Sequence, residues 1–485
     1  MEWSREKRYR QIKDVSKESY DALVNQVATS KYRQKYHVQP KSGLLNDPNG
    51  FSYFNGQYHL FYQWFPLGPV HGLKNWYHVS SKDLVHWEDH GIGLAPEKYY
   101  ETHGVFSGTG FVKDDQLYLF YTGNTRVGDW VRIPYQCLAI MDKDGQIKKA
   151  EKPLIKDSPE GFTDNYRDPK VLEYNGRYYC LIGAEKSSHH GCIAYYSSDD
   201  LYNWTYEGVL PVAYNGGYMW ECPDYFTLED KGIMLVSVQG QEKEGDRYNN
   251  IFPAGYLVGN TIDFTNPSFD GNTLYELDHG FDFYAPQTTV DKDGRRILVG
   301  WLGLPGVDCV TDEDGWAHCI TLPRELSLKD GHLYQKPADE LELLCINERT
   351  HSFILNGSQT FDDVKGHTYR LKVLFESLEA DTGVKLRCGQ HEETLFYYDS
   401  QLKKLVFDRT HSGVSFNEEY GSKRYVAYNH NFLKLDIFVD VSSVEVFVND
   451  GEYVFTSRIF TKPDSEGITF FSDEETKTHI CMYDI

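Results

Sequence analysis

The 485-residue sequence contains no apolar run close to the roughly 18 residues that a membrane-spanning helix needs. Its first residues, MEWSREKRYRQIKDVSKESYDALV, are charged and lack the apolar core of a signal peptide. The nine cysteines are scattered, odd in number and without a C-x-x-C pair, so neither a disulfide framework nor a zinc site is predicted. We therefore expect a cytoplasmic protein that does not bind a membrane.

Positive charge is also scarce, because 49 Lys and Arg stand against 72 Asp and Glu for a formal net charge of −23. Nucleic acid is therefore not an expected partner, and an anionic small molecule would need a local basic pocket. Only 5 methionines are present, whereas 37 tyrosines and 41 glycines favour an all-β chain with many turns. Both a monomer and a homodimer remain open.

Five segments in the first two-thirds of the chain share one pattern, a turn followed by a mostly apolar, β-rich run. They cover residues 55–64, 114–123, 175–184, 230–239 and 293–302. Their second residues are 59, 61, 55 and 63 positions apart, and SSKDLVHW (80–87) recurs two units later as SSDDLYNW (197–204). Repeated four-stranded sheets arranged radially form a β-propeller, so we predict five blades.

Acidic residues stand upstream of three of these five turns: Asp47, Asp168 and Glu221. Ser107 and Pro286 take the corresponding place in the other two repeats. If the strand after this position is the innermost of its blade, the side chains converge on the propeller axis. A single Asp-Pro is usually a turn, but three clustered like charges oppose one another, so function is the better explanation.

Convergent carboxylates have two chemical uses, and the first is to bind a hard metal ion. No D-x-D-x-D-G loop with a glutamate at its twelfth position is present. The acidic turns at 142–146, 291–295 and 312–316 are interpreted as hairpins. Because P-loop and G-x-S-x-G signatures are also missing, we predict neither a metal nor a cofactor.

The second use is glycoside hydrolysis, which needs two carboxyl groups in different protonation states. Glu221, between Trp220 and Cys222, suits a proton donor whose pKa is raised by its surroundings. Asp47, which neighbours asparagines, suits an ionised nucleophile. Asp168 would add to the negative field that keeps Glu221 protonated.

The motifs LLNDPNG, FYQ, FSGT, YRDPK, WECPDYF, FDFYAPQT and LPREL occur in this order and resemble the invertase family of glycoside hydrolases, family 32. The resemblance covers residues 35 to 485 and implies a five-bladed propeller, a β-sandwich and retaining cleavage of β-fructofuranosides. It assigns Asp47 as nucleophile, Glu221 as acid/base and Asp168 as transition-state stabiliser. It also implies a set of residues that bind the sugar: Leu44, Leu45, Asn46, Gln63, Trp76, Phe106, Ser107, Arg167, Cys222 and Trp301.

The segment GPVHGLKNWYHVSSKDLVHW looks like the branch of this family that acts on sucrose 6-phosphate. His71 and Lys74 are then the candidate contacts for the phosphate. Hydrolysis of fructans or fructooligosaccharides, and fructosyl transfer on the same scaffold, remain alternatives. A propeller that binds carbohydrate without catalysis is an alternative of another class.

Three regions are predicted. Residues 1–34 form a helical extension, in which 13–34 are a helix against the propeller; residues 35–335 form the catalytic propeller. Short alternating strands at 345–485, with the hairpin turn Asn-Asp-Gly at 449–451, predict the β-sandwich. Packing support is the expected role of this last domain.

Overall fold

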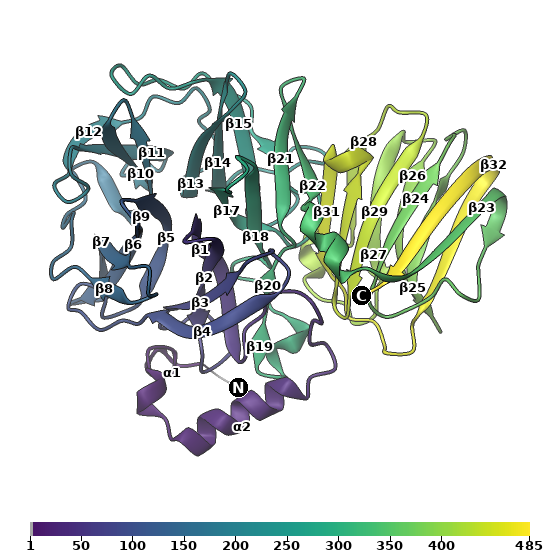
Figure 1. Ribbon diagram of the computed structural model, residues 1–485, viewed down its shortest axis with the longest axis horizontal. Helices are drawn as coiled ribbons and strands as arrows, with labels where there is room; N and C mark the ends of the chain where they lie inside the picture. Colours follow the sequence, from purple (N-terminus) through teal and green to yellow (C-terminus); the bar gives the residue numbers. More distant parts are fainter. Residues whose placement is uncertain (1–2) are drawn as a thin grey trace.

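The computed structural model describes residues 3–485, most of which lie in β-strands (Figure 1). A ring of sheets built by the first two-thirds of the chain stands beside a layered β body built by the last third. The predicted all-β class, with a five-bladed propeller followed by a second β domain, is confirmed.

The first strand of each blade is its innermost, and these strands are β1 (Gly43–Phe54), β5 (Val105–Lys113), β9 (Phe162–Tyr174), β13 (Met219–Leu228) and β17 (Tyr284–Val290). The second strands are β2 (Gln57–Phe65), β6 (Gln116–Val127), β10 (Arg177–Lys186), β14 (Lys231–Gln239) and β18 (Arg296–Leu302). The outer strands are β3 (Asn75–Ser81), β4 (Trp87–Leu94), β7 (Val131–Met141), β8 (Ile147–Lys149), β11 (Gly191–Ser198), β12 (Thr205–Val209), β15 (Ala254–Asn260), β16 (Tyr275–Glu276), β21 (Arg324–Lys329) and β22 (His332–Pro337).

The innermost strands contact one another around a closed ring, in the order β1, β5, β9, β13, β17 and back to β1. Closure is reinforced by β19 (Trp316–Ala317), which pairs in parallel with β1 before β20 (Cys319–Ile320) returns to the fifth sheet. The apolar runs that reveal the repeat are therefore the second strands. The predicted acidic positions lie within the innermost strands themselves, which corrects the expectation that the innermost strand follows them.

The second sequence repeat is also a structural repeat. Asp83 and Asp200 each accept backbone N–H groups two and three residues ahead, at 2.8–3.0 Å. Each turn is closed by the indole N–H of Trp87 or Trp204, which donates to a carbonyl three residues earlier. The turn at 312–316 differs from its prediction, because it leads from a 3-10 helix, η2 (Val310–Asp312), into the parallel strand β19 and is not a hairpin.

The C-terminal domain begins after the 3-10 helix η3 (Asp339–Leu344). Its strands are β23 (Ile346–Gln359), β24 (Tyr369–Phe375), β25 (Thr382–Gly389), β26 (Glu392–Asp399), β27 (Lys404–His411), β28 (Lys423–Ala427), β29 (Leu433–Asp440), β30 (Ser443–Val448), β31 (Tyr453–Arg458) and β32 (Gly467–Asp484). Two short 3-10 helices, η4 (Glu418–Tyr420) and η5 (Asn449–Gly451), interrupt them.

The two layers of this domain belong to one curled sheet. The first part of β32 pairs with β25 through residues 467–472, and its last part pairs with β24 through 478–484. The strand thus crosses from one layer to the other, and apolar side chains from both layers, such as Val384, Ile437 and Phe455, fill the core between them.

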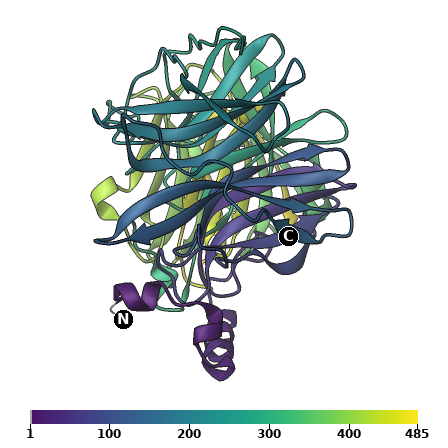
Figure 2. The same ribbon diagram turned by 90° about the vertical axis from the view of Figure 1, so that its left-hand side faces the viewer.

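The N-terminal extension contains α1 (Arg5–Arg8), η1 (Ile12–Asp14) and α2 (Lys17–Ala28), which lie outside the sheets in both views (Figures 1 and 2). Residues 1 and 2 of the predicted extension lie outside the described part. The helix predicted over 13–34 is shorter because Ser16 caps its start by accepting the N–H of Ser19, and because it ends at Ala28. No helix within residues 3–485 is long and apolar enough to cross a membrane.

A buried ionic cluster joins the propeller to the C-terminal domain. His37 Nδ1 lies 2.7 Å from Asp440 Oδ2, and its Nε2 lies 3.1 Å from Glu445 Oε1. Arg324 donates to Glu445 and to Asp278 at 3.0 and 2.9 Å. Burial opposes protonation of His37, but its hydrogen bonds with two carboxylates outweigh burial and raise its pKa to about 9.

This cluster predicts a pH-dependent stability. Because the pKa of His37 is raised on folding, its contribution is complete below the unfolded value of about 6.5 and is lost as pH rises through about 9. That contribution is about 3 kcal/mol. We expect the free energy of unfolding, measured by urea denaturation from pH 6 to pH 10, to fall in this window in the native chain. His37→Gln should lower stability at pH 6 and flatten the fall, whereas His86→Gln, at an exposed histidine, should not. An unchanged pH dependence in His37→Gln would contradict the assignment.

Candidate active site

Each innermost strand carries a β-bulge where the sequence repeat predicts a site. The ladder to the second strand is interrupted between Leu45 and Pro48, Val105 and Gly108, Arg167 and Lys170, Glu221 and Asp224, and Tyr284 and Gln287. A bulge bends the strand and changes the direction of its side chains. Each of the five blades therefore contributes one bulge near the axis of the propeller.

The bulges correct the predicted alignment of the acids. Asp168, Cys222 and Ala285 each precede a proline and have positive φ angles of 67°, 47° and 47°. Cys222 is therefore the counterpart of Asp168, and Glu221 occupies the position of Arg167, one residue earlier. Left-handed backbone at residues other than glycine is strained, and such strain is concentrated at functional sites.

Asp47 is held by side chains from two blades. Its Oδ2 accepts the hydroxyl of Ser107, and its Oδ1 accepts Asn46 Nδ2 at 3.1 Å. Gln63 links the same two neighbours, because it accepts from Asn46 at 2.9 Å and donates to Ser107. Burial raises the pKa of Asp47 and the charge of Glu221 raises it further, while Ser107 and Asn46 lower it.

Glu221 is held by three donors. Arg167 donates to its Oε1 from Nε at 3.2 Å and from Nη2 at 2.7 Å. Tyr284 and Gln239 each donate to its Oε2 at 2.7 Å. The Glu221 side chain keeps 14% exposure and therefore reaches solvent.

The protonation expected for Glu221 differs from its sequence prediction. Burial favours the neutral acid, but the charge of Arg167 and the hydrogen bonds from Tyr284, Arg167 and Gln239 outweigh it and lower the pKa. The pKa of Asp168 is raised instead, to about 7, by burial and by the charges of Glu221 and Asp47. In the free protein Asp168 therefore holds a proton more readily than Glu221.

Cys222 brings the three acids together. Its backbone N–H donates to Asp168 Oδ2 at 2.9 Å. Its Sγ lies 3.6 Å from Asp168 Oδ2 and 3.9 Å from Asp47 Oδ2, while Glu221 is the adjacent residue. Burial raises the pKa of the thiol, so Cys222 is a neutral donor between two carboxylates.

The remaining predicted sugar-binding residues fall into two groups. Phe106 is half-buried and lies beside the acids in the bulge of β5, and its carbonyl accepts the indole N–H of Trp76 at 3.0 Å. By contrast, Leu44, Leu45, Trp76 and Trp301 are each at most 3% exposed. We interpret these four side chains as the packed wall behind the acids.

Lys74 and His71, the two candidate phosphate contacts of the sequence, differ in their surroundings. Lys74 is buried, and its Nζ donates to Asn46 Oδ1, next to Asp47. Burial lowers the pKa of Lys74 to about 7, although Asp47 opposes this. His71 is exposed, with its ring 6.0 Å from that of Trp301. The structure thus places Lys74 against Asn46, the neighbour of the candidate nucleophile.

Sequence reasoning missed the hydrogen-bonding roles of Gln239 and Tyr284. Gln239 is the polar last residue of the mostly apolar repeat segment 230–239. A polar residue at that position could have indicated that Gln239 faces the site. Tyr284 stands in the motif FDFYAPQT, but nothing in that motif predicts its hydrogen bond to Glu221.

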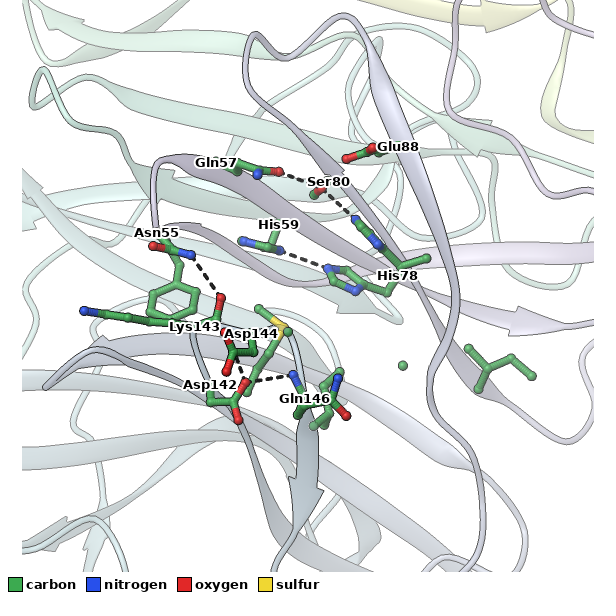
Figure 3. A pocket seen from close by; sticks show the side chains of 17 residues that line it. Asn55, Gln57, His59, His78, Ser80, Glu88, Asp142, Lys143, Asp144 and Gln146 are labelled. Atoms are coloured by element: carbon green, nitrogen blue, oxygen red, sulfur yellow. Dashed lines mark hydrogen bonds between the residues drawn. The ribbon is translucent and has the colours of Figure 1, made fainter.

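A concavity of about 520 Å³ is lined by residues of the first two blades (Figure 3). His59 Nδ1 lies 3.0 Å from His78 Nε2, and the ring of His78 stacks on that of His90. Burial and the charge of His90 lower the pKa of His59 to about 4. The lining includes none of the predicted site residues. Separately, no group of three or more His, Cys, Asp or Glu within residues 3–485 is arranged to hold a metal ion.

Comparisons with known proteins identify the family of the chain. The family model described as Glycosyl hydrolases family 32 N-terminal domain matches residues 37–337, and the corresponding C-terminal model matches 340–484. A sucrose-6-phosphate hydrolase of Staphylococcus xylosus is 43% identical, covering 100% of this chain and 99% of the relative. The solved sucrose-6-phosphate hydrolase of Lactobacillus gasseri is 38% identical, covers 100% of this chain and 99% of that chain, and gives a TM-score of 0.94. A family 32 β-fructofuranosidase of Bombyx mori is 33% identical, covers 98% of this chain and 99% of that chain, and gives a TM-score of 0.84.

Proposed function

Because this chain belongs to glycosyl hydrolase family 32, we propose that it hydrolyses sucrose 6-phosphate to glucose 6-phosphate and fructose, and sucrose to glucose and fructose. The observation that carries the proposal is the meeting of Asp47, Asp168 and Glu221 around Cys222, from three separate blades. The phosphorylated substrate is supported by relatives of that name at 37–43% identity.

In the proposed reaction Asp47 attacks the anomeric carbon of the fructosyl unit while Glu221 protonates the departing glucosyl oxygen. The C–O bond to glucose breaks as the bond to the Asp47 carboxylate forms. Glu221 then removes a proton from water, which attacks the fructosyl ester and frees Asp47. Asp168, close to both, bonds fructose hydroxyls.

Glu221 must carry a proton when the glycosidic bond breaks, although its pKa is lowered in the free protein. A bound sugar displaces water from Glu221, and this desolvation favours the neutral carboxyl. The negative charge of Asp47 acts in the same direction. Substrate binding thereby raises the pKa of Glu221, which Arg167 lowers.

The function is tested by kinetics of the purified chain with sucrose, sucrose 6-phosphate and short inulin. We expect kcat/KM to be highest for sucrose 6-phosphate. A preference for unphosphorylated oligomers would favour a fructan hydrolase, and kestose formation at high sucrose would favour fructosyl transfer. Tight binding of fructosides without turnover would identify a carbohydrate-binding protein.

Tyr284→Phe should shift the pH profile of kcat/KM toward higher pH. The tyrosine hydroxyl stabilises ionised Glu221 and thereby lowers its pKa, so removing the hydroxyl should raise that pKa. The alkaline limb of kcat/KM, which reports loss of a proton from the carboxyl cluster that contains Glu221, should move to higher pH. Tyr202→Phe, at an exposed tyrosine on the third blade, is the matched control. A shift of the limb to lower pH would contradict the assigned role of Glu221.

We place this activity inside the cell. A sugar phosphate is charged and does not cross a bilayer unaided, so its hydrolase works where the phosphate ester is formed. All nine cysteines are free within the described chain, in keeping with a reducing compartment.

A further inference from the structure

Three arginines, Arg126, Arg132 and Arg167, lie close to one another in a chain of net charge −23, and Arg167 binds Glu221. Strands β6 and β7 form a hairpin. Arg126 on β6 and Arg132 on β7 are directly paired across it, next to its turn. Arg132 Nη1 donates to Asn165 Oδ1 at 2.8 Å, and Arg167 Nη1 donates to the same oxygen at 2.9 Å. Asn165 therefore holds Arg132 against the arginine that binds Glu221.

The positive charge of this cluster is only partly compensated. Glu221 is paired with Arg167, and the carboxylate of Asp164 lies 3.9 Å from Arg126. The Nε atoms of Arg126 and Arg132 are buried and have no hydrogen-bond partner among residues 3–485. Burial and repulsion from Arg167 and Arg126 lower the pKa of Arg132 to about 10. Folding alone gains nothing from bringing these cations together, so the arrangement points to an anionic ligand.

The cluster lies on the side of the site where the leaving group departs. Glu221 is the proposed donor to the glucosyl oxygen, so the glucosyl unit lies next to it. Arg132 is connected to Glu221 through Asn165, which accepts from both Arg132 and Arg167. The guanidinium of Arg132 lies 5.9 Å from the ring centre of Phe106. In sucrose 6-phosphate the phosphate is on C6 of that glucosyl unit, whereas the reacting bond is at C1.

The N-terminal extension supports the hairpin that carries these arginines. The guanidinium of Arg5 lies 4.2 Å from the ring centre of Trp130, at the hairpin tip, and the Tyr9 ring contacts the same indole at 5.2 Å. Arg126 is held from within the hairpin by the carbonyl of Trp130, at 3.0 Å. The extension thus packs against the tip of the hairpin and adds the cation of Arg5 there.

From these contacts we infer that Arg126 and Arg132 form the subsite for the phosphate of the leaving sugar. This inference rests on the proposed function and assigns its specificity to the β6–β7 hairpin. Guanidinium groups suit the task because their paired N–H donors match phosphate oxygens. Lys74 does not compete, because its ammonium is engaged with Asn46 on the fructosyl side.

The test compares kcat/KM for sucrose 6-phosphate and for sucrose in the full-length chain. In Arg132→Gln and in Arg126→Gln we expect the ratio of the two values to fall roughly 10- to 100-fold. Inhibition by glucose 6-phosphate should weaken in parallel, whereas inhibition by glucose should weaken less. Arg132→Lys keeps the charge but loses the paired donors, so an intermediate ratio is expected.

Two variants serve as comparisons. Arg177→Gln removes an exposed arginine paired with Asp199 on another blade and should leave the ratio at the native value. Lys74→Ala should lower both kcat/KM values together, because Lys74 contacts the fructosyl side. A ratio changed only by Lys74→Ala would assign the phosphate to Lys74 and overturn the inference.

Failure of the subsite differs from failure of the proposed function. A native chain that hydrolyses neither sugar would reject the function. A native chain that prefers sucrose 6-phosphate, with that preference intact in both arginine variants, would reject the subsite alone. Equal native values for the two sugars would also overturn the subsite.

Discussion

Asp47→Ala is expected to lower kcat for sucrose 6-phosphate by roughly 10,000-fold or more, because it removes the group that bonds to the anomeric carbon. Neither Asn46 nor Ser107, its neighbours, can replace a carboxylate nucleophile. The measurement is release of fructose by the purified variant. Its thermal unfolding midpoint should stay near the native value, because the lost hydrogen bonds are offset by relief of repulsion from Glu221.

The matched control is Asp115→Asn, at an exposed hairpin residue with a positive φ angle of 61° that asparagine also tolerates. It should retain native activity. Near-native turnover by folded Asp47→Ala would remove Asp47 from the reaction and would leave Asp168 as the candidate nucleophile.

Glu221→Gln is expected to lower kcat for sucrose 6-phosphate by roughly 100- to 10,000-fold, because the variant can neither protonate the leaving oxygen nor activate water. A fructoside with a nitrophenol leaving group needs little protonation, so its cleavage should be impaired far less. Its fructosyl-enzyme should then accumulate, because hydrolysis of the ester lacks a base.

This accumulation can be read by mass spectrometry, as the mass of one fructosyl unit on the peptide that contains Asp47. Glu173→Gln, at an exposed glutamate of the same propeller, should behave like the native chain. Equal losses in the first-turnover rate of bond cleavage for sucrose 6-phosphate and the nitrophenyl fructoside would reject Glu221 as the acid. A fructosyl unit on Asp168 would reassign the nucleophile.

The two assignments depend on each other through charge. The negative charges of Asp47 and Glu221 repel each other, so each makes ionisation of the other less favourable. Both charges also act on Asp168, whose pKa is raised to about 7. The protons of this group therefore titrate together, and the pH profile belongs to the cluster. Arg167 decides which member ionises first, because it bonds Glu221 through two nitrogens.

The all-β class, the five blades and the family could be predicted from the sequence because their signals are local. Turn residues, the β-rich runs near 60 residues apart and the acidic motifs each occupy a few consecutive positions. The alignment of the acids could not be predicted, because Glu221 lies before its bulge and Asp168 lies within one, a difference set by strand pairing. The length of α2 was overestimated, since its end depends on packing beneath the propeller.

The sequence by itself determined that three acids stand at repeated positions in a family 32 chain. The residue types and their spacing can be read directly from the order of the amino acids. Tertiary structure decided their protonation and surroundings. Glu221 receives Arg167 from 54 residues away and Tyr284 from 63 residues away, and Lys74 is buried against Asn46 and so not free for a phosphate. Burial and hydrogen bonding across blades fix which charges meet, and such long-range contacts leave no periodic signal in the sequence.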